Sequence, residues 1–135
     1  MGDEGNNFTV LYVDNWEPSL RAFRRACQEQ FRVLTALNSL EGLDQLREHQ
    51  NEIGVVVAAR CMPIRKGTWL LQRARECHPQ IVRILASDGC SSVEEEDSLR
   101  AGIAERIIPI PWEPPELIKR LHAELQRFAV RRGGR

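Results

Sequence analysis

Short apolar runs rich in β-branched residues alternate along the chain with segments whose apolar residues recur every three or four positions. The runs cover residues 8–13, 31–36, 53–59, 81–87 and 105–109. Each run predicts a buried strand, and each segment between runs predicts an amphipathic helix. Strands that alternate with helices pair in parallel through right-handed crossovers. The alternation therefore predicts an α/β fold, a three-layer (βα)5 sandwich in which helices cover both faces of a parallel five-stranded sheet.

Local signals indicate where the helices begin and which way they face. Asn38 with Glu41, and Ser91 with Glu94, have the spacing of capped first turns. The acidic run 94–97 predicts a solvated first turn at the positive end of a helix dipole. The residues expected on buried helix faces are Leu20, Phe23, Cys27, Leu40, Leu43, Leu46, Leu70, Ala74, Cys77, Leu117, Leu121, Leu125 and Phe128.

Length and charge exclude several classes of protein. A chain of 135 residues has room for one ordinary domain, and its 19 Lys and Arg residues balance 19 Asp and Glu residues. This balance gives no net attraction to nucleic acid or to a membrane surface, so we expect direct binding to neither. No apolar run approaches the roughly 20 residues that span a bilayer, and the first residues lack a signal-peptide pattern. We therefore expect a cytoplasmic protein.

The expected organisation is one domain with short ends. Residues 1–7 are predicted to be a flexible N-terminal segment, residues 8–129 the folded domain, and residues 130–135 a C-terminal tail or the start of a linker. The four cysteines show no C-x-x-C spacing and no metal-ligand spacing with the histidines. They therefore predict free thiols rather than a zinc site.

Four strand ends predict where a functional site would lie. In an open parallel sheet, ligands and reactive groups lie beyond the carboxyl ends of the strands. Those ends are at Asp14, Ala59, Ser87 and Ile110. No glycine-rich phosphate loop follows any strand, and no nucleophile–base pair lies at these ends. We therefore expect neither a nucleotide cofactor nor an enzyme.

The segments around these strand ends resemble the receiver domain of bacterial two-component response regulators. The matching stretches are VLYVDNWEPSLRAF at 10–23, VVVAARCMP at 55–63 with Gly67 after it, HPQIVRILAS at 78–87 and IPIPWEPPEL at 108–117. The resemblance covers nearly the whole chain. It implies a CheY-like, flavodoxin-like sheet with strand order 2-1-3-4-5 and a role in phosphorelay signal transduction.

The same resemblance implies a degenerate phosphorylation site. In receivers an acidic pair holds Mg²⁺, an Asp ends the third strand and accepts the phosphoryl group, a Ser or Thr ends the fourth, and a Lys precedes a Pro after the fifth. The matching positions here are Asp14-Asn15, Ala59, Ser87 and Ile110. A methyl group accepts no phosphoryl group, and Ile110 carries no charge. Because only Asp14 of the metal ligands remains, we expect weak Mg²⁺ binding and no cofactor. The resemblance thus implies a pseudo-receiver that is not phosphorylated.

Three alternatives stay open at this edge. Arg60 and Lys66 would hold a small anion together with Ser87, which would make the domain a ligand sensor. Cys61 and Cys90 follow strands that are neighbours in the implied order, which would allow a redox sensor. The third alternative is an ordinary receiver that is phosphorylated at another residue.

Without phosphate chemistry, the expected function is protein–protein interaction. The expected partner is a signalling protein or an output domain, and a homodimer is a further option. Candidate contact residues are Trp112 and Leu117 near the last strand and helix, and Arg21 and Arg24 on the first helix.

Overall fold

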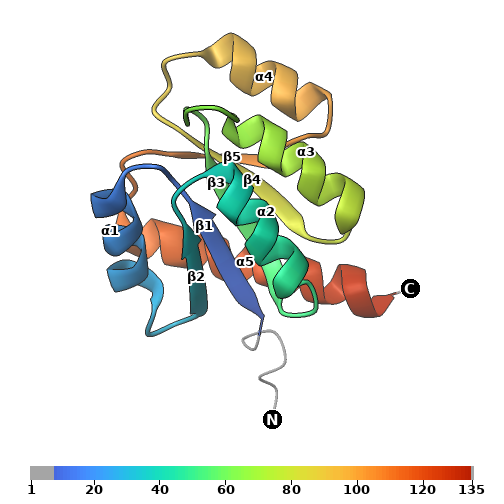
Figure 1. Cartoon of the computed structure of the whole chain (residues 1–135). Coiled ribbons are helices and arrows are strands. Elements are labelled where there is room, and N and C mark those ends of the chain that lie inside the picture. Colours follow the sequence, from blue (N-terminus) through green and yellow to red (C-terminus); the bar gives the residue numbers. More distant parts are fainter. Residues whose placement is uncertain (1–7, 135) are drawn as a thin grey trace.

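The computed structural model describes residues 8–134 and contains one five-stranded sheet (Figure 1). All neighbouring strands pair in parallel, in the order β2-β1-β3-β4-β5. The strands are β1 (Thr9–Val13), β2 (Arg32–Ala36), β3 (Ile53–Ala59), β4 (Val82–Ser87) and β5 (Arg106–Pro109). The predicted fold class and strand order are confirmed.

Helices cover both faces of the sheet and make the predicted three layers. The helices are α1 (Glu17–Cys27), α2 (Ser39–Glu48), α3 (Gly67–Cys77), α4 (Ser92–Arg100) and α5 (Pro114–Gly134). Helix α1 packs with α5, and α2 packs with α3 (Figure 1). Every residue of β1, β3 and β4 is buried, which explains why those runs show no apolar–polar alternation. None of the helices among residues 8–134 is long and apolar enough to cross a membrane.

Helix starts follow the predicted capping signals. The Asn38 side chain accepts a hydrogen bond from the Glu41 amide at 2.8 Å, and the Ser91 hydroxyl accepts one from the Glu94 amide at 3.2 Å. Helix α3 begins against the end of β3, where a Cβ atom on Gly67 would lie 2.1 Å from the Ala59 carbonyl oxygen. Only glycine allows this approach, which brings the β3–α3 loop onto the edge of the sheet.

Two residues expected in the core lie at the surface. Leu40 is 50% exposed, because it stands in the first turn of α2, away from the Leu43 and Leu46 side that meets the sheet. Cys77 is exposed as the last residue of α3, whereas Cys27 is buried as predicted, and burial raises the pKa of its thiol to about 12. The other residues predicted for buried helix faces lie in the core.

The C-terminal boundary differs from the prediction. Helix α5 continues to Gly134, so the expected domain end at residue 129 falls inside a helix. The extension is held against the domain because Arg131 donates hydrogen bonds to the Gln80 carbonyl at 3.0 Å and to Glu105. The predicted N-terminal segment, residues 1–7, lies outside the described residues.

Candidate functional site

A hollow of about 190 Å³ lies at the carboxyl ends of the strands. The four strand-end residues singled out in the sequence all line it: Asp14, Ala59, Ser87 and Ile110. Four further residues complete the lining: Arg60, Cys61, Ala86 and Asp88. Asn15 is exposed and lies outside this lining. The topology therefore brings the predicted positions to one edge of the sheet.

Two positions of the hollow carry no group that reacts or ionises. Ala59, the last residue of β3, is buried and pairs with Ala86 of β4. Ile110 is half-buried, follows β5 and precedes a cis-proline, Pro111. Its amide donates to the Ser87 carbonyl at 2.9 Å. The hollow thus presents a methyl group and an alkyl chain at the two positions where a receiver has its acceptor Asp and its Lys.

Both oxygens of the Asp14 carboxylate accept hydrogen bonds from nearby residues. The Tyr12 hydroxyl donates to Asp14 Oδ2 at 2.7 Å, and the Trp16 amide donates to Asp14 Oδ1 at 3.1 Å. Burial raises the pKa of Tyr12, so its phenol keeps its proton and remains a donor. The Tyr12 hydroxyl also lies 2.9 Å from the Ser19 hydroxyl in α1. The Asp14 carboxylate therefore fixes the β1–α1 turn.

The donor atoms of the hollow do not fit Mg²⁺. This cation requires near-octahedral oxygen coordination, in which carboxylates supply the charge. Both oxygens of Asp14 already accept hydrogen bonds, and the other carboxylate of the lining, Asp88, pairs with Arg60 and accepts from the Cys90 amide. Ala59 supplies no oxygen from its side chain. Within residues 8–134, no three His, Cys, Asp or Glu side chains gather in a way that could hold a metal ion. Weak Mg²⁺ binding stays a prediction of this geometry.

Arg60 links the ends of β3 and β4 to helix α4. Its Nε donates to the Ser87 hydroxyl at 3.3 Å, and its Nη1 donates to the Glu94 carboxylate at 2.9 Å. The Arg60 Nη2 lies 3.4 Å from Asp88 Oδ1. The hydrogen bond that Arg60 donates to Glu94 raises the pKa of the Arg60 guanidinium. We call this set, Arg60 with Ser87, Asp88 and Glu94, the Arg60 clamp.

The Arg60 clamp occupies the guanidinium that was expected to attract an anion. Lys66 Nζ lies 3.8 Å from the second carboxylate oxygen of Glu94, and every nitrogen of the Arg60 guanidinium has a partner within the clamp. Ser87 also accepts a hydrogen bond from the Gly89 amide at 3.2 Å. Arg60 and Ser87 therefore bond each other, whereas Lys66 lies outside the lining of the hollow and meets Glu94 from an exposed position.

Two partners of Arg60 were missed in the sequence. Glu94 was interpreted as part of a solvated acidic turn, yet its side chain is largely buried between Arg60 and Lys66. Asp88 follows Ser87 directly and had no assigned role. The sequence did carry a signal for this pairing: an arginine follows β3, and two acids follow β4. Parallel neighbouring strands bring the loops after them to the same edge of the sheet, where opposite charges can pair.

The two cysteines of the redox alternative are exposed free thiols. Cys61 lines the hollow, and Cys90 follows β4 in the loop before α4. The Cys90 amide donates to Asp88 Oδ1 at 2.9 Å. Hydrogen bonding to Asp88 raises the pKa of the Cys90 thiol, which lowers its thiolate fraction.

The four candidate contact residues differ in accessibility. Leu117 is only 3% exposed because its side chain points from α5 into the core, so the prediction that it contacts a partner is wrong. Trp112 is half-buried, and its ring packs edge-on against Tyr12 and Phe23 with centroids 5.5 Å apart. Arg21 and Arg24 are exposed on α1.

Comparison with curated sequences finds two transcriptional regulators. The chain is 36% identical over 114 residues, 82% of its length, to the hydrogenase transcriptional regulatory protein HoxA of Cupriavidus necator. It is 28% identical over 128 residues, 92% of its length, to HoxA of Bradyrhizobium diazoefficiens. The chain spans 22% and 25% of the length of these two relatives. No protein-family model matches the chain.

Comparison with solved structures finds the same architecture. A response regulator receiver domain protein (CheY-like) from Methanospirillum hungatei JF-1 superposes with a TM-score of 0.80 and 25% sequence identity. The superposition covers 90% of this chain and 96% of that chain.

Proposed function

Because the chain belongs to the CheY-like receiver domains of response regulators, we propose that it is a receiver that signals without being phosphorylated. It acts as a non-enzymatic interaction module in a two-component pathway, without a bound cofactor. Its partner is a signalling protein or an output domain. The matched region makes up 22% and 25% of the two HoxA regulators, so most of each relative consists of sequence beside the receiver, which supports a partner of that kind.

The observation that carries this proposal is the Arg60 clamp beside Ala59. A ligand shifts a two-state equilibrium only by binding one state better than the other. With a methyl group at the acceptor position, no acyl phosphate forms there, so this source of differential binding energy is absent. The guanidinium of Arg60 instead bonds both the Ser87 hydroxyl and the first turn of α4, with no phosphoryl group needed for either contact. The domain therefore stays in one arrangement of α4.

The proposal is tested by incubating the chain with acetyl phosphate and Mg²⁺ and weighing the intact protein by mass spectrometry. The expected result is no gain of a phosphoryl group. The matched control carries Asn15→Asp, Ala59→Asp and Ile110→Lys, which restores the three missing side chains. This control should gain one acid-stable, alkali-labile phosphoryl group.

A phosphoryl group on the unaltered chain would overturn the proposal. Peptide mapping would then identify the acceptor, and Asp14 and Asp88 are the carboxylates that line the hollow. Label on either residue would restore the ordinary receiver function.

A further inference from the structure

The four cysteines of the chain differ in exposure and in position. Cys27 is buried, whereas Cys61, Cys77 and Cys90 are exposed free thiols. Cys61 lies in the loop between β3 and α3, and Cys90 lies in the loop between β4 and α4. Strands β3 and β4 are parallel neighbours, so both loops leave the sheet at the same edge. Cys77 stands at the far end of α3 from this edge. Two of the three exposed thiols therefore share one edge.

Hydrogen bonds join the two loops that carry Cys61 and Cys90. The Arg60 amide donates to the Ala86 carbonyl at 2.8 Å, and Cys61 is the next residue. The Asp88 Oδ1 atom accepts from the Cys90 amide at 2.9 Å and lies 3.4 Å from Arg60 Nη2. One carboxylate oxygen thus connects the residue before Cys61 with the backbone of Cys90, which keeps the two loops together.

The two thiols are close enough to affect each other's charge. Hydrogen bonding to Asp88 is the largest cause of the raised pKa of Cys90; negative charge on Cys61 raises this pKa further, and the Arg60 guanidinium lowers it. Negative charge on Cys61 also adds to the raised pKa of Arg60, which its hydrogen bond to Glu94 raises most. Such interactions between exposed charges fade over roughly 10 Å at ordinary ionic strength. The Cys61 sulfur therefore lies near both Cys90 and the guanidinium.

We propose that Cys61 and Cys90 form a reversible disulfide when the chain meets a hydroperoxide. In the first step, hydrogen peroxide oxidises one thiol to a sulfenic acid and is itself reduced to water. In the second step, the sulfur of the other cysteine attacks the sulfenic sulfur, the S–S bond forms, the S–O bond breaks, and a second water leaves. The pair loses two hydrogens in total, and a dithiol reductant returns both thiols. The raised pKa of Cys90 lowers its thiolate fraction, so we expect the link to form over minutes to hours rather than at once.

The disulfide would add a covalent tie across the edge that the Arg60 clamp spans. It would join the loop before α3 to the loop before α4. Only Ser98 of α4 is buried, so this helix is held by few packed side chains and opens locally. A crosslink in the loop that leads into α4 reduces the conformations open to that helix. Oxidation would thus strengthen one arrangement of α4 without an acceptor Asp; this regulatory role rests on the interaction function proposed above.

The first test exposes the folded chain to dilute hydrogen peroxide, then alkylates it with N-ethylmaleimide in denaturant and weighs it. The mass should fall by about 2 Da before alkylation, the two hydrogens that the disulfide removes. Two of the four cysteines should then resist alkylation, and peptide mapping should find Cys61 linked to Cys90. At about 10 μM protein, a neighbouring thiol with an effective concentration on the order of 1 mM favours the link within one chain about 100-fold over links between chains. Dithiothreitol should restore all four thiols.

Single cysteine variants show whether the pairing is specific. Cys61→Ser and Cys90→Ser should each abolish the loss of mass, whereas Cys77→Ser, which removes the third exposed thiol, should form the link like the unaltered chain. Because all three positions are exposed, circular dichroism should show unchanged folds. Four reactive thiols after oxidation, separate sulfinic acids at Cys61 and Cys90, or a link from either residue to Cys77 would overturn the proposal.

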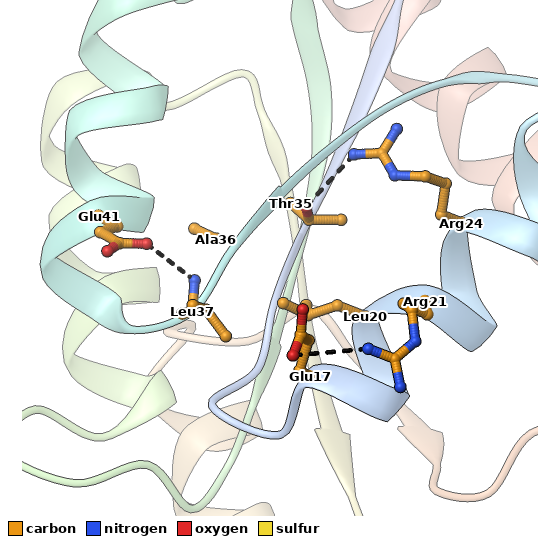
Figure 2. A pocket seen from close by; sticks show the side chains of 8 residues that line it. All are labelled: Glu17, Leu20, Arg21, Arg24, Thr35, Ala36, Leu37 and Glu41. Atoms are coloured by element: carbon orange, nitrogen blue, oxygen red, sulfur yellow. Dashed lines mark hydrogen bonds and ion pairs between the residues drawn. The ribbon is translucent and has the colours of Figure 1, made fainter.

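Amide hydrogen exchange tests the effect on α4 without any phosphoryl donor. The amides of α4 should exchange at least about threefold more slowly in the oxidised chain, and reduction should reverse this change. Helix α1 is the control, because it lies at the opposite end of the molecule from α4 (Figure 1). Its side chains have their own contacts beside a hollow of about 270 Å³ (Figure 2): Arg21 Nη1 lies 3.5 Å from Glu17 Oε1, and Arg24 donates to the Thr35 hydroxyl at 3.3 Å. Exchange in α1 should therefore stay the same.

Equal α4 exchange in the reduced and oxidised chains would overturn the regulatory role. Failure of either thiol experiment would leave the phosphorylation result standing, because that result does not depend on the cysteines.

Discussion

Replacing Arg60 with glutamine removes the charge that ties helix α4 to the edge of the sheet. The Arg60–Glu94 pair spans 2.9 Å, with side chains 11% and 25% exposed. A partly buried pair of this kind contributes about 1–2 kcal/mol after its desolvation cost. The Asp88 contact at 3.4 Å is open to solvent and adds little. The Ser87 hydrogen bond at 3.3 Å adds about 0.5 kcal/mol. Together, the contacts of the Arg60 clamp stabilise the docked position of α4 by about 2 kcal/mol.

Amide hydrogen exchange measures this quantity directly. Helix α4 has one buried residue, so its amides exchange through local opening rather than through global unfolding. A loss of about 2 kcal/mol raises the exchange rate of the α4 amides about 30-fold. The amides to follow include Glu95, bonded to the Ser91 carbonyl, and Ala101, bonded to the Asp97 carbonyl. Exchange in β1 and β3 should change far less.

Two controls isolate the Arg60–Glu94 pair. Arg73→Gln removes an exposed ion pair with Glu76 on α3 and should leave α4 exchange unchanged. A double-mutant cycle of Arg60→Gln and Glu94→Gln should give a coupling free energy of about 1–2 kcal/mol. Equal α4 exchange in Arg60→Gln and in the unaltered chain, or a coupling free energy near zero, would refute the idea that the clamp holds α4.

Three further changes test other parts of the structure by chemical denaturation. Gly67→Ala should lower the free energy of unfolding by about 2–3 kcal/mol, because its Cβ would lie 2.1 Å from the Ala59 carbonyl oxygen; a neutral result would mean that α3 does not start this close to β3. Glu105→Gln should cost about 1–3 kcal/mol at neutral pH. Burial alone would raise the pKa of Glu105, but Arg131 holds it below its ordinary value of 4.5, so this stabilisation is complete above pH 4.5 and is lost as the pH falls through the lowered pKa. A difference between the two proteins that persists at lower pH would contradict this assignment. Ile64→Asn should raise the free energy of unfolding by about 1 kcal/mol, since Ile64 is 86% exposed and has a φ of 68°, a left-handed conformation that asparagine tolerates better; a loss of stability would show that the isoleucine side chain makes contacts that outweigh this conformational cost.

The fold could be predicted because its signals are local and periodic. Every residue of β3 is buried, and this is why the sequence shows an unbroken apolar run from Ile53 to Ala59. The caps at Asn38 and Ser91 form the hydrogen bonds that their spacing predicted. The errors lie at helix ends. Leu40 and Cys77 have the right spacing, but the first and last turns of a helix reach past the sheet that would bury them.

The candidate site could be predicted in position but not in its bonding. The parallel sheet brings Asp14, Ala59, Ser87 and Ile110 to one edge, as the order of the strands requires. The direction in which a long side chain extends follows from tertiary packing, which the sequence does not state. Arg60 therefore looked available for an anion, whereas it is bonded to Ser87 and Glu94.

Amide NMR spectra of the unaltered chain, recorded before and after addition of acetyl phosphate with Mg²⁺, test the central claim most directly. The Arg60 clamp predicts that the resonances of Ser87, Gly89 and Glu94 keep their positions. The variant with Asn15→Asp, Ala59→Asp and Ile110→Lys should show shifts at these residues under the same conditions. Phosphoryl-dependent shifts of Ser87 and Glu94 in the unaltered chain would contradict the account, because they would show that this edge still switches with phosphate.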